Sequence, residues 1–144
     1  YGPNDNYDLE KSHVLPALIR KFHEAKLNGS EEVVVWGSGK PMREFLHVDD
    51  LAKACLILMQ KYDEAGFLNI GFGSDISISE LSAMISEIVG FKGKIVFDTN
   101  RADGTVRKLM DSSKIQSLGW APKIGLSNGI SSTYELFSKQ LSQI

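Results

Sequence analysis

The stretch VVVWGSGKPMREFLHVDDLAKAC, residues 33–55, decides the fold because it passes from strand to turn to helix within a short distance. Its β-branched and aromatic residues predict a strand over 32–37, and SGKP, residues 38–41, is typical of a tight turn. Alternating side chains predict a second strand over 43–48, beside the first. A helix is predicted over 49–62, with Asp49 or Asp50 as its N-cap.

The segments on either side continue this alternation of helices and strands. Apolar residues at helical spacing predict a helix that begins between Ser12 and Leu15, with Pro16 in its first turn, and ends near Leu27. Downstream, the pattern predicts strands over 67–72 and 93–98, a polar loop over 99–108, and helices over 77–90, around 111–120 and over 126–141. The predicted fold class is therefore mixed α/β, an α+β-like small domain that spans residues 1–144.

The composition limits the possible classes of function. The chain has 144 residues, 42% of them hydrophobic, which is enough for one core and too few for two ordinary domains. It carries 16 basic and 18 acidic residues, so no general attraction to nucleic acid or an anionic membrane is expected. The single Cys55 excludes an internal disulfide and is interpreted as a core residue of its helix. The sequence shows no signal peptide or membrane span, which favours a cytoplasmic location.

His13 is the first candidate for chemistry because it lies where the first helix is predicted to begin. The helix dipole disfavours a positive charge there, so we expect a neutral imidazole that can act as a general acid or base. The alternative is that His13 only caps the helix or hydrogen-bonds to the preceding loop. His23 is interpreted as a surface residue and His47 as a strand residue.

Trp36 and Arg43 form a second candidate site, because the two predicted strands would bring them together. An aromatic plane and a guanidinium can hold a planar base and a phosphate, whereas the alternative is a core tryptophan and a surface ion pair. The loop RADGTVRK, residues 101–108, combines Asp103 with Arg107 and Lys108. It is interpreted either as a lid over a diphosphate or as an ordinary solvated loop. We expect no metal site.

The segments YGPNDN, SHVLPALIRKFHEAK, VVVWGSGKPMREFLHVDDLAKAC and DGTVRKLMD, followed by LGW, resemble in this order the C-terminal part of the GDP-L-fucose synthase family. Members of that family are NADP-dependent extended short-chain dehydrogenase/reductases. The resemblance implies that the chain is a substrate-binding portion that lacks most of the Rossmann domain. The start of the chain on Tyr1, inside a turn, also leads us to expect a piece of a longer protein.

The family converts GDP-4-keto-6-deoxy-D-mannose to GDP-L-fucose by 3,5-epimerisation and NADPH-dependent reduction at C4. By resemblance, His13 is the acid/base of the epimerisation, acts together with a cysteine from the other domain, and lies close to the cofactor. The resemblance assigns substrate contacts to Lys21, Trp36, Arg43, Asp103 and Lys108. Lys21 stands where the family often has arginine, so it keeps the charge but loses the guanidinium fork.

Two elements that the family needs for reduction are missing from this sequence. It contains neither a glycine-rich strand-to-helix turn for NADP nor a Tyr-x-x-x-Lys pair on a helix, since YDLEK, residues 7–11, lies in a predicted loop. The resemblance thus implies NADP(H) in the full-length enzyme, its own N-terminal Rossmann domain as a partner, and a homodimer. The chain alone is expected to bind no cofactor and to be inactive. The rival interpretations are another nucleotide-sugar epimerase or dehydratase and a non-catalytic nucleotide-binding module.

Overall fold

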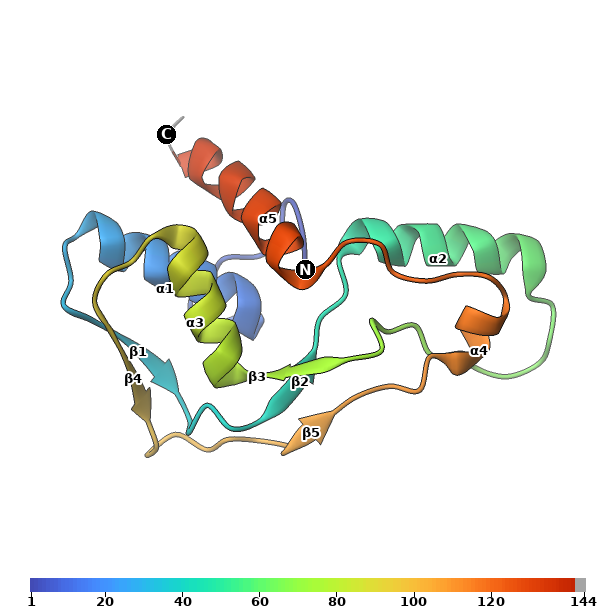
Figure 1. Cartoon of the computed structure of the whole chain (residues 1–144), viewed down its shortest axis with the longest axis horizontal. Helices are drawn as coiled ribbons and strands as arrows, with labels where there is room; N and C mark the ends of the chain where they lie inside the picture. The colour runs from blue at the N-terminus through green and yellow to red at the C-terminus, as the bar shows by residue number, and fades with distance from the viewer. Residues whose placement is uncertain (142–144) are drawn as a thin grey trace.

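Two small sheets form the frame of the protein in the computed structural model, which describes residues 1–141 (Figure 1). In the first sheet, β1 (Glu32–Trp36) runs parallel to β4 (Lys94–Asp98). In the second, β2 (Met42–Glu44) lies between antiparallel β3 (Asp75–Ser77) and parallel β5 (Arg107–Lys108). The predicted pairing of the strands on either side of the SGKP turn is therefore wrong. All five residues of β1 pair with β4, which leaves the three-residue β2 to pair in the other sheet.

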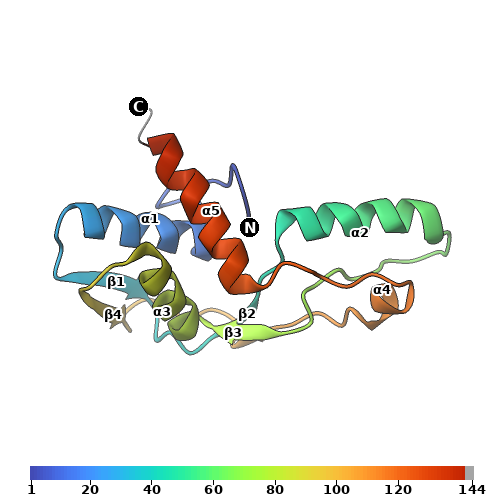
Figure 2. The ribbon, with the colours of Figure 1, turned by 45° about the horizontal axis from the view of Figure 1, so that its top comes forward.

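Three helices, α1 (Val14–Leu27), α3 (Ile78–Val89) and α5 (Leu126–Leu141), enclose the larger hydrophobic core beside the first sheet (Figure 2). The buried residues of α1 include Leu15, Leu18, Ile19, Phe22 and Ala25, at the predicted helical spacing. His23 is buried as well, and its Nδ1 atom lies 3.1 Å from the hydroxyl of Tyr134 on α5. The interpretation of His23 as a surface residue is wrong because α5 covers this side of α1, which no pattern within α1 reveals.

The first and third predicted helices form within one residue of their predicted ends. α1 begins at Val14 and contains Pro16 in its first turn, where the missing N–H costs no hydrogen bond. Ser77 caps α3 through a reciprocal capping box with Glu80. Gly90 then ends α3 in the left-handed conformation, with φ of 77°.

His47, rather than an aspartate, caps α2 (Val48–Lys61). Its Nδ1 atom accepts the N–H of Asp49 at 3.2 Å, so the predicted N-cap at Asp49 or Asp50 is wrong. The second predicted strand ends at Glu44, well before His47, and the interpretation of His47 as a strand residue is wrong too. The helix begins earlier than predicted because the histidine ring satisfies one of its first N–H groups.

The carboxylate of Asp50 is buried and makes a long-range contact instead. Its Oδ2 atom accepts the backbone N–H groups of Lys123 and Ile124, each at 2.8 Å. This pair of hydrogen bonds fastens the start of α2 to the segment that precedes α5. Asp50 therefore has a long-range structural role, which its position beside Asp49 in the sequence does not indicate.

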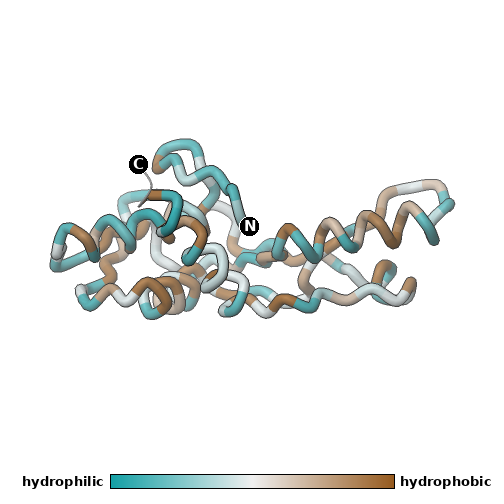
Figure 3. The backbone as a smooth tube through the Cα atoms, turned by 90° about the horizontal axis from the view of Figure 1, so that it is seen from above, coloured by the Kyte–Doolittle hydropathy of each residue, from teal (hydrophilic) through white to brown (hydrophobic). Residues whose placement is uncertain are grey.

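A smaller apolar cluster lies between α2 and α4 (Ser113–Ser117), around Ala54, Ile115 and Trp120. Cys55 is exposed, so its interpretation as a core residue is wrong. Apolar residues continue along α2 (Figure 3), and the exposed ones are Val48, Leu51, Leu56 and Met59. No strand forms over the predicted residues 67–72, because within residues 1–141 no strand lies beside them to complete a ladder.

Helices alternating with short strands give the mixed α/β content that the sequence predicts. The strand predicted over 93–98 corresponds to β4, and the last two predicted helices correspond to α4 and α5. Within the described part of the chain, no helix is both long and apolar enough to cross a membrane.

Candidate functional site

A cavity of about 370 Å³ lies at the N-terminal end of α1, between the first residues of the chain and β2. His13, Arg43 and Lys108 line it, together with Asp5 and Phe45. Three residues selected from distant parts of the sequence thus converge on one cavity. An imidazole beside two cations can serve an anionic ligand on which a proton is moved, and the acidic residues Asp5 and Glu44 also line the cavity.

His13 occupies the N-cap position of α1 with an extended backbone, φ −72° and ψ 163°. Its side chain makes no capping hydrogen bond, and the residue is exposed. The alternative in which the imidazole caps the helix is therefore wrong. The ring is held at the helix start by the backbone, and its nitrogen atoms remain available to a ligand.

Arg43 and Lys108 are fixed relative to each other because they are opposite residues of the paired strands β2 and β5. The Nη1 atom of Arg43 donates to the carbonyl of Met42 at 2.7 Å, which leaves the other guanidinium nitrogens for a ligand. The predicted polar loop over 99–108 is wrong at its last two residues, since these form β5. Backbone pairing, which the loop interpretation did not include, is what brings Lys108 to Arg43.

Asp103 makes a different contact and does not line the cavity of His13. Its carboxylate accepts the N–H and the hydroxyl of Ser38, each at 2.6 Å, and these hydrogen bonds lower the pKa of Asp103. Gly37 has φ of +84°, and a Cβ atom at this position would lie 2.5 Å from Asp103 Oδ1. Asp103 thus anchors its loop to the turn after Trp36, where glycine permits the close approach.

Lys21 and Trp36 line a second, largely apolar cavity of about 220 Å³, with Leu18 and Glu10. Val14 lines both cavities, so they adjoin at the first turn of α1. Trp36 is 49% exposed, and the alternative of a core tryptophan is therefore wrong.

The ammonium group of Lys21 is held close to the indole ring. Its Nζ atom donates to the carbonyl of Val34 at 3.2 Å and lies 4.8 Å from the centre of the Trp36 ring. Burial lowers the pKa of Lys21, the negative charge of Glu10 opposes this effect, and the positive charge of Arg101 adds to it. The lysine is thus a partly desolvated cation beside an aromatic plane.

Arg101 is a candidate site residue that the sequence reasoning missed. Its Cζ atom lies 4.9 Å from the centre of the Trp36 ring. Trp36 pairs with Asp98 in the β1–β4 register, so the turn after Asp98 returns Arg101 to the tryptophan. Knowledge of this strand pairing would have predicted the contact between Arg101 and Trp36. The sequence alone, however, does not show that β1 pairs with β4.

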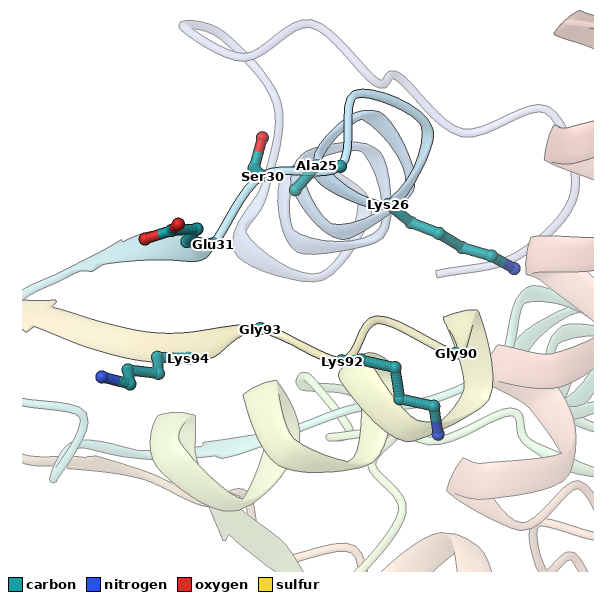
Figure 4. A pocket seen from close by; sticks show the side chains of 9 residues that line it. Ala25, Lys26, Ser30, Glu31, Gly90, Lys92, Gly93 and Lys94 are labelled. Atoms are coloured by element: carbon teal, nitrogen blue, oxygen red, sulfur yellow. The ribbon is translucent and has the colours of Figure 1, made fainter.

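A third, open cavity of about 550 Å³ lies at the other end of α1 and β1 (Figure 4). Lys26, Lys92 and Lys94 line it, and none of the predicted site residues does. The Nζ atom of Lys26 donates to the carbonyl of Val89 at 2.8 Å and so gives a hydrogen-bond partner to the last carbonyl group of α3. Within residues 1–141, no group of three or more His, Cys, Asp or Glu side chains is arranged to hold a metal ion.

The chain is similar to several known proteins. Residues 1–71 match the NAD dependent epimerase/dehydratase family. GDP-L-fucose synthase 1 of Arabidopsis thaliana is 58% identical over 141 residues, which cover 98% of this chain and 44% of that protein. The structure of a GDP-L-fucose synthetase from Naegleria fowleri bound to NADP has a TM-score of 0.92 and 32% identity, over 99% of this chain and 45% of that one. The structure of a GDP-6-OMe-4-keto-L-xylo-heptose reductase from C. jejuni has a TM-score of 0.88 and 40% identity, over 97% of this chain and 51% of that one.

The likeness to these proteins covers nearly all of this chain and only part of theirs. The chain spans less than half the length of the Arabidopsis relative, at 44%. Sequence and fold agree, since these two structures share the arrangement of elements and are 40% and 32% identical to this chain. Residues 1–71 match the NAD dependent epimerase/dehydratase family, and nearly the whole chain is similar to GDP-L-fucose synthases.

Proposed function

We propose that this chain is the substrate-binding part of a GDP-L-fucose synthase, which converts GDP-4-keto-6-deoxy-D-mannose to GDP-L-fucose. The convergence of His13, Arg43 and Lys108 on one cavity carries the proposal. The identity of 58% to a GDP-L-fucose synthase supports the choice of substrate. Because the chain covers 44% of that relative, the complete reaction needs the remainder of the enzyme.

The two adjoining cavities suit the two ends of such a substrate. The apolar cavity beside Trp36 receives the guanine base, and Lys21 lies at its side. Arg43 and Lys108, in the neighbouring cavity, bind the diphosphate through charge-assisted hydrogen bonds. This arrangement directs the keto-sugar towards His13. Asp103 contributes by holding the loop that precedes Lys108, through its bonds to Ser38.

The chemistry assigned to His13 is proton transfer at the carbons beside the C4 keto group. Removal of a proton from C3 or C5 leaves an electron pair that the carbonyl accepts as an enolate, and return of a proton to the opposite face inverts the carbon. His13 gives or takes one of these protons, and a cysteine from the other domain, which the family resemblance implies, serves the opposite face.

NADPH, when bound by the remainder of the enzyme, supplies the hydride that reduces C4. The exposed position of His13 fits a residue that lies between the substrate and a cofactor held by another part of the protein. The chain's own contribution to reduction is to orient the sugar, since Arg43 and Lys108 fix its diphosphate.

The exposed apolar side of α2 supports the proposal of an N-terminal NADP-binding domain as a partner. Met59 on α2 is 83% exposed and Phe67, in the segment after the helix, is 90% exposed, although both side chains are large and apolar. The backbone of residues 67–72 also lacks a neighbouring strand within residues 1–141, so a strand of the other domain can pair with it. The proposed enzyme is a homodimer in the cytoplasm. A chain with a single cysteine suits the reducing conditions of that compartment.

The test is to incubate the complete protein that contains this chain with NADPH and GDP-4-keto-6-deoxy-D-mannose in deuterated water. We expect GDP-L-fucose with deuterium at C3 and C5, identified by NMR. The second candidate is a GDP-sugar reductase without epimerisation, which the 40% identity to the C. jejuni heptose reductase favours. Reduced sugar without deuterium at C3 and C5 would support this second candidate and contradict the first.

A further inference from the structure

Trp36 has two cations beside its ring, although these cations repel each other. The Nζ atom of Lys21 is 4.8 Å from the ring centre, and the Cζ atom of Arg101 is 4.9 Å from it. The two charges are within electrostatic reach of each other, because the charge of Arg101 contributes to lowering the pKa of Lys21, after burial. An anion placed between them would relieve this repulsion.

Both cations keep hydrogen-bond donors free for such an anion. Lys21 donates to the carbonyl of Val34 at 3.2 Å, and Glu10 acts on it only at longer range. The Nε atom of Arg101 forms an ion pair with Asp98 Oδ2 at 3.9 Å, which is too long for a hydrogen bond and leaves the guanidinium donors free. Across residues 1–141, the guanidinium of Arg101 donates no hydrogen bond, and its side chain is 61% exposed.

The backbone fixes Arg101 in this place. Its N–H donates to the carbonyl of Asp98 at 3.1 Å, and Asp98 Oδ1 accepts the N–H of Asn100 at 3.1 Å. This turn follows β4 directly, and the β1–β4 register places Asp98 opposite Trp36. The position of Arg101 therefore depends on sheet pairing and a hydrogen-bonded turn.

We infer that Lys21 and Arg101 together bind a phosphate group at the edge of Trp36, and that Arg101 supplies the guanidinium fork that Lys21 lacks. The inference rests on the proposed function and adds Arg101 to the residues that bind the diphosphate of the nucleotide sugar. Lysine occupies position 21, where the resembling family often has arginine, and a single ammonium cannot make the bidentate contact of a guanidinium. Arg101 restores that contact from the opposite element, the turn after β4.

The experiment measures GDP binding by calorimetry in the complete protein that contains this chain. We expect Arg101→Ala to weaken GDP binding by about tenfold or more, since one charge-assisted contact is lost. Adding Lys21→Arg to that variant should restore the affinity to within about threefold of the wild type, because a guanidinium returns to the same ring. Guanosine, which has no phosphate, should bind wild type and Arg101→Ala equally.

A matched control removes a cation elsewhere on the same sheet. Lys92→Ala, in the cavity at the other end of β4, should leave GDP binding unchanged. Unchanged GDP binding in Arg101→Ala would overturn the inference and leave the proposed function standing. An equal loss for guanosine, or failure of Lys21→Arg to restore binding, would also overturn it. A wild-type protein that binds no GDP would overturn both the inference and the proposed function.

Discussion

Asp103 and Ser38 join the loop after β4 to the turn after β1 through two hydrogen bonds, each of 2.6 Å. Ser38 donates both, from its N–H and its hydroxyl, so the contact is strongest when Asp103 is ionised. The pKa of Asp103 is accordingly lowered from its ordinary value. A depressed folded-state pKa means that the stabilisation is present above the ordinary range of aspartate and is lost as the pH falls through the lowered value.

Removing the Ser38 hydroxyl tests this electrostatic contact. Ser38→Ala should raise the pKa of Asp103 towards the ordinary aspartate value of about 3.9, because one of its two donors is lost. NMR titration of the Asp103 carboxyl carbon measures the shift. Asp111, whose pKa is lowered by its own hydrogen bond to Ser113, is the internal control and should not change. An Asp103 pKa that is the same in both proteins would show that the hydroxyl has no electrostatic effect.

The elements that depend on local patterns are the ones the sequence predicted well. α1 and α3 have strong helical spacing with Pro16 and Ser77 at their starts, and both helices are confirmed. Contacts between distant segments were not predictable, because nothing local shows that β1 pairs with β4. The same limit explains why the interpretations of His23, which α5 covers, and of Cys55, which lies on the exposed side of α2, are both wrong.

For the site, the sequence predicted candidate residues but not how the structure groups them. Trp36 and Arg43 were expected together, whereas they line different cavities. Lys108 joins Arg43 only through the β2–β5 pairing. The roles assigned to these residues stay predictions.

Arg43→Ala in the complete enzyme should raise KM for the nucleotide sugar with a smaller effect on kcat. The lost charge-assisted contact to a phosphate is worth about 1.5–3 kcal/mol, which corresponds to a roughly 10-fold to 150-fold change. Steady-state kinetics measures it. Lys94→Ala removes a cation from the start of β4, outside this cavity, and should leave KM unchanged. An unaltered KM in a folded Arg43→Ala enzyme would make Arg43 a purely structural residue.

Leu56→Asp on the exposed side of α2 should distinguish the chain alone from the complete protein. Leu56 is exposed in the chain alone, so the substitution should change the melting temperature of the chain alone only a little. In the complete protein the proposed second domain buries this position, and an aspartate there should cost about 2 kcal/mol or more. Differential scanning calorimetry of both proteins makes the comparison. Gln60→Glu, an exposed polar position on the same helix, serves as the charge control, and equal effects of Leu56→Asp in both proteins would contradict a covering domain.

The chain alone should neither bind NADPH nor turn over GDP-4-keto-6-deoxy-D-mannose. Its sequence contains no glycine-rich strand-to-helix turn and no Tyr-x-x-x-Lys pair on a helix. Titration calorimetry with NADPH checks the first part, and absorbance of NADPH in the presence of substrate checks the second. Micromolar NADPH binding by the 144-residue chain would mean that it holds a dinucleotide site of another kind.

His13→Asn should separate catalysis from helix formation. The wild-type imidazole makes no capping hydrogen bond, and asparagine is a favourable N-cap, so the variant should melt at or above the wild-type temperature. Its rate of deuterium exchange at C3 and C5 of the keto-sugar should nevertheless fall by roughly 100-fold or more, because a general acid/base is lost. NMR of the substrate in deuterated water measures the exchange in the complete enzyme.

The outcome for reduction tells whether His13 serves only the epimerisation. Hydride delivery to C4 depends on groups outside this chain, so the His13→Asn enzyme should still oxidise NADPH and release 6-deoxyhexose products that have not been inverted. His23→Asn, which changes a buried histidine on the same helix, is the matched control for damage to α1 and should lower the melting temperature instead. Wild-type exchange rates in a His13→Asn enzyme of normal stability would remove His13 from the catalytic residues.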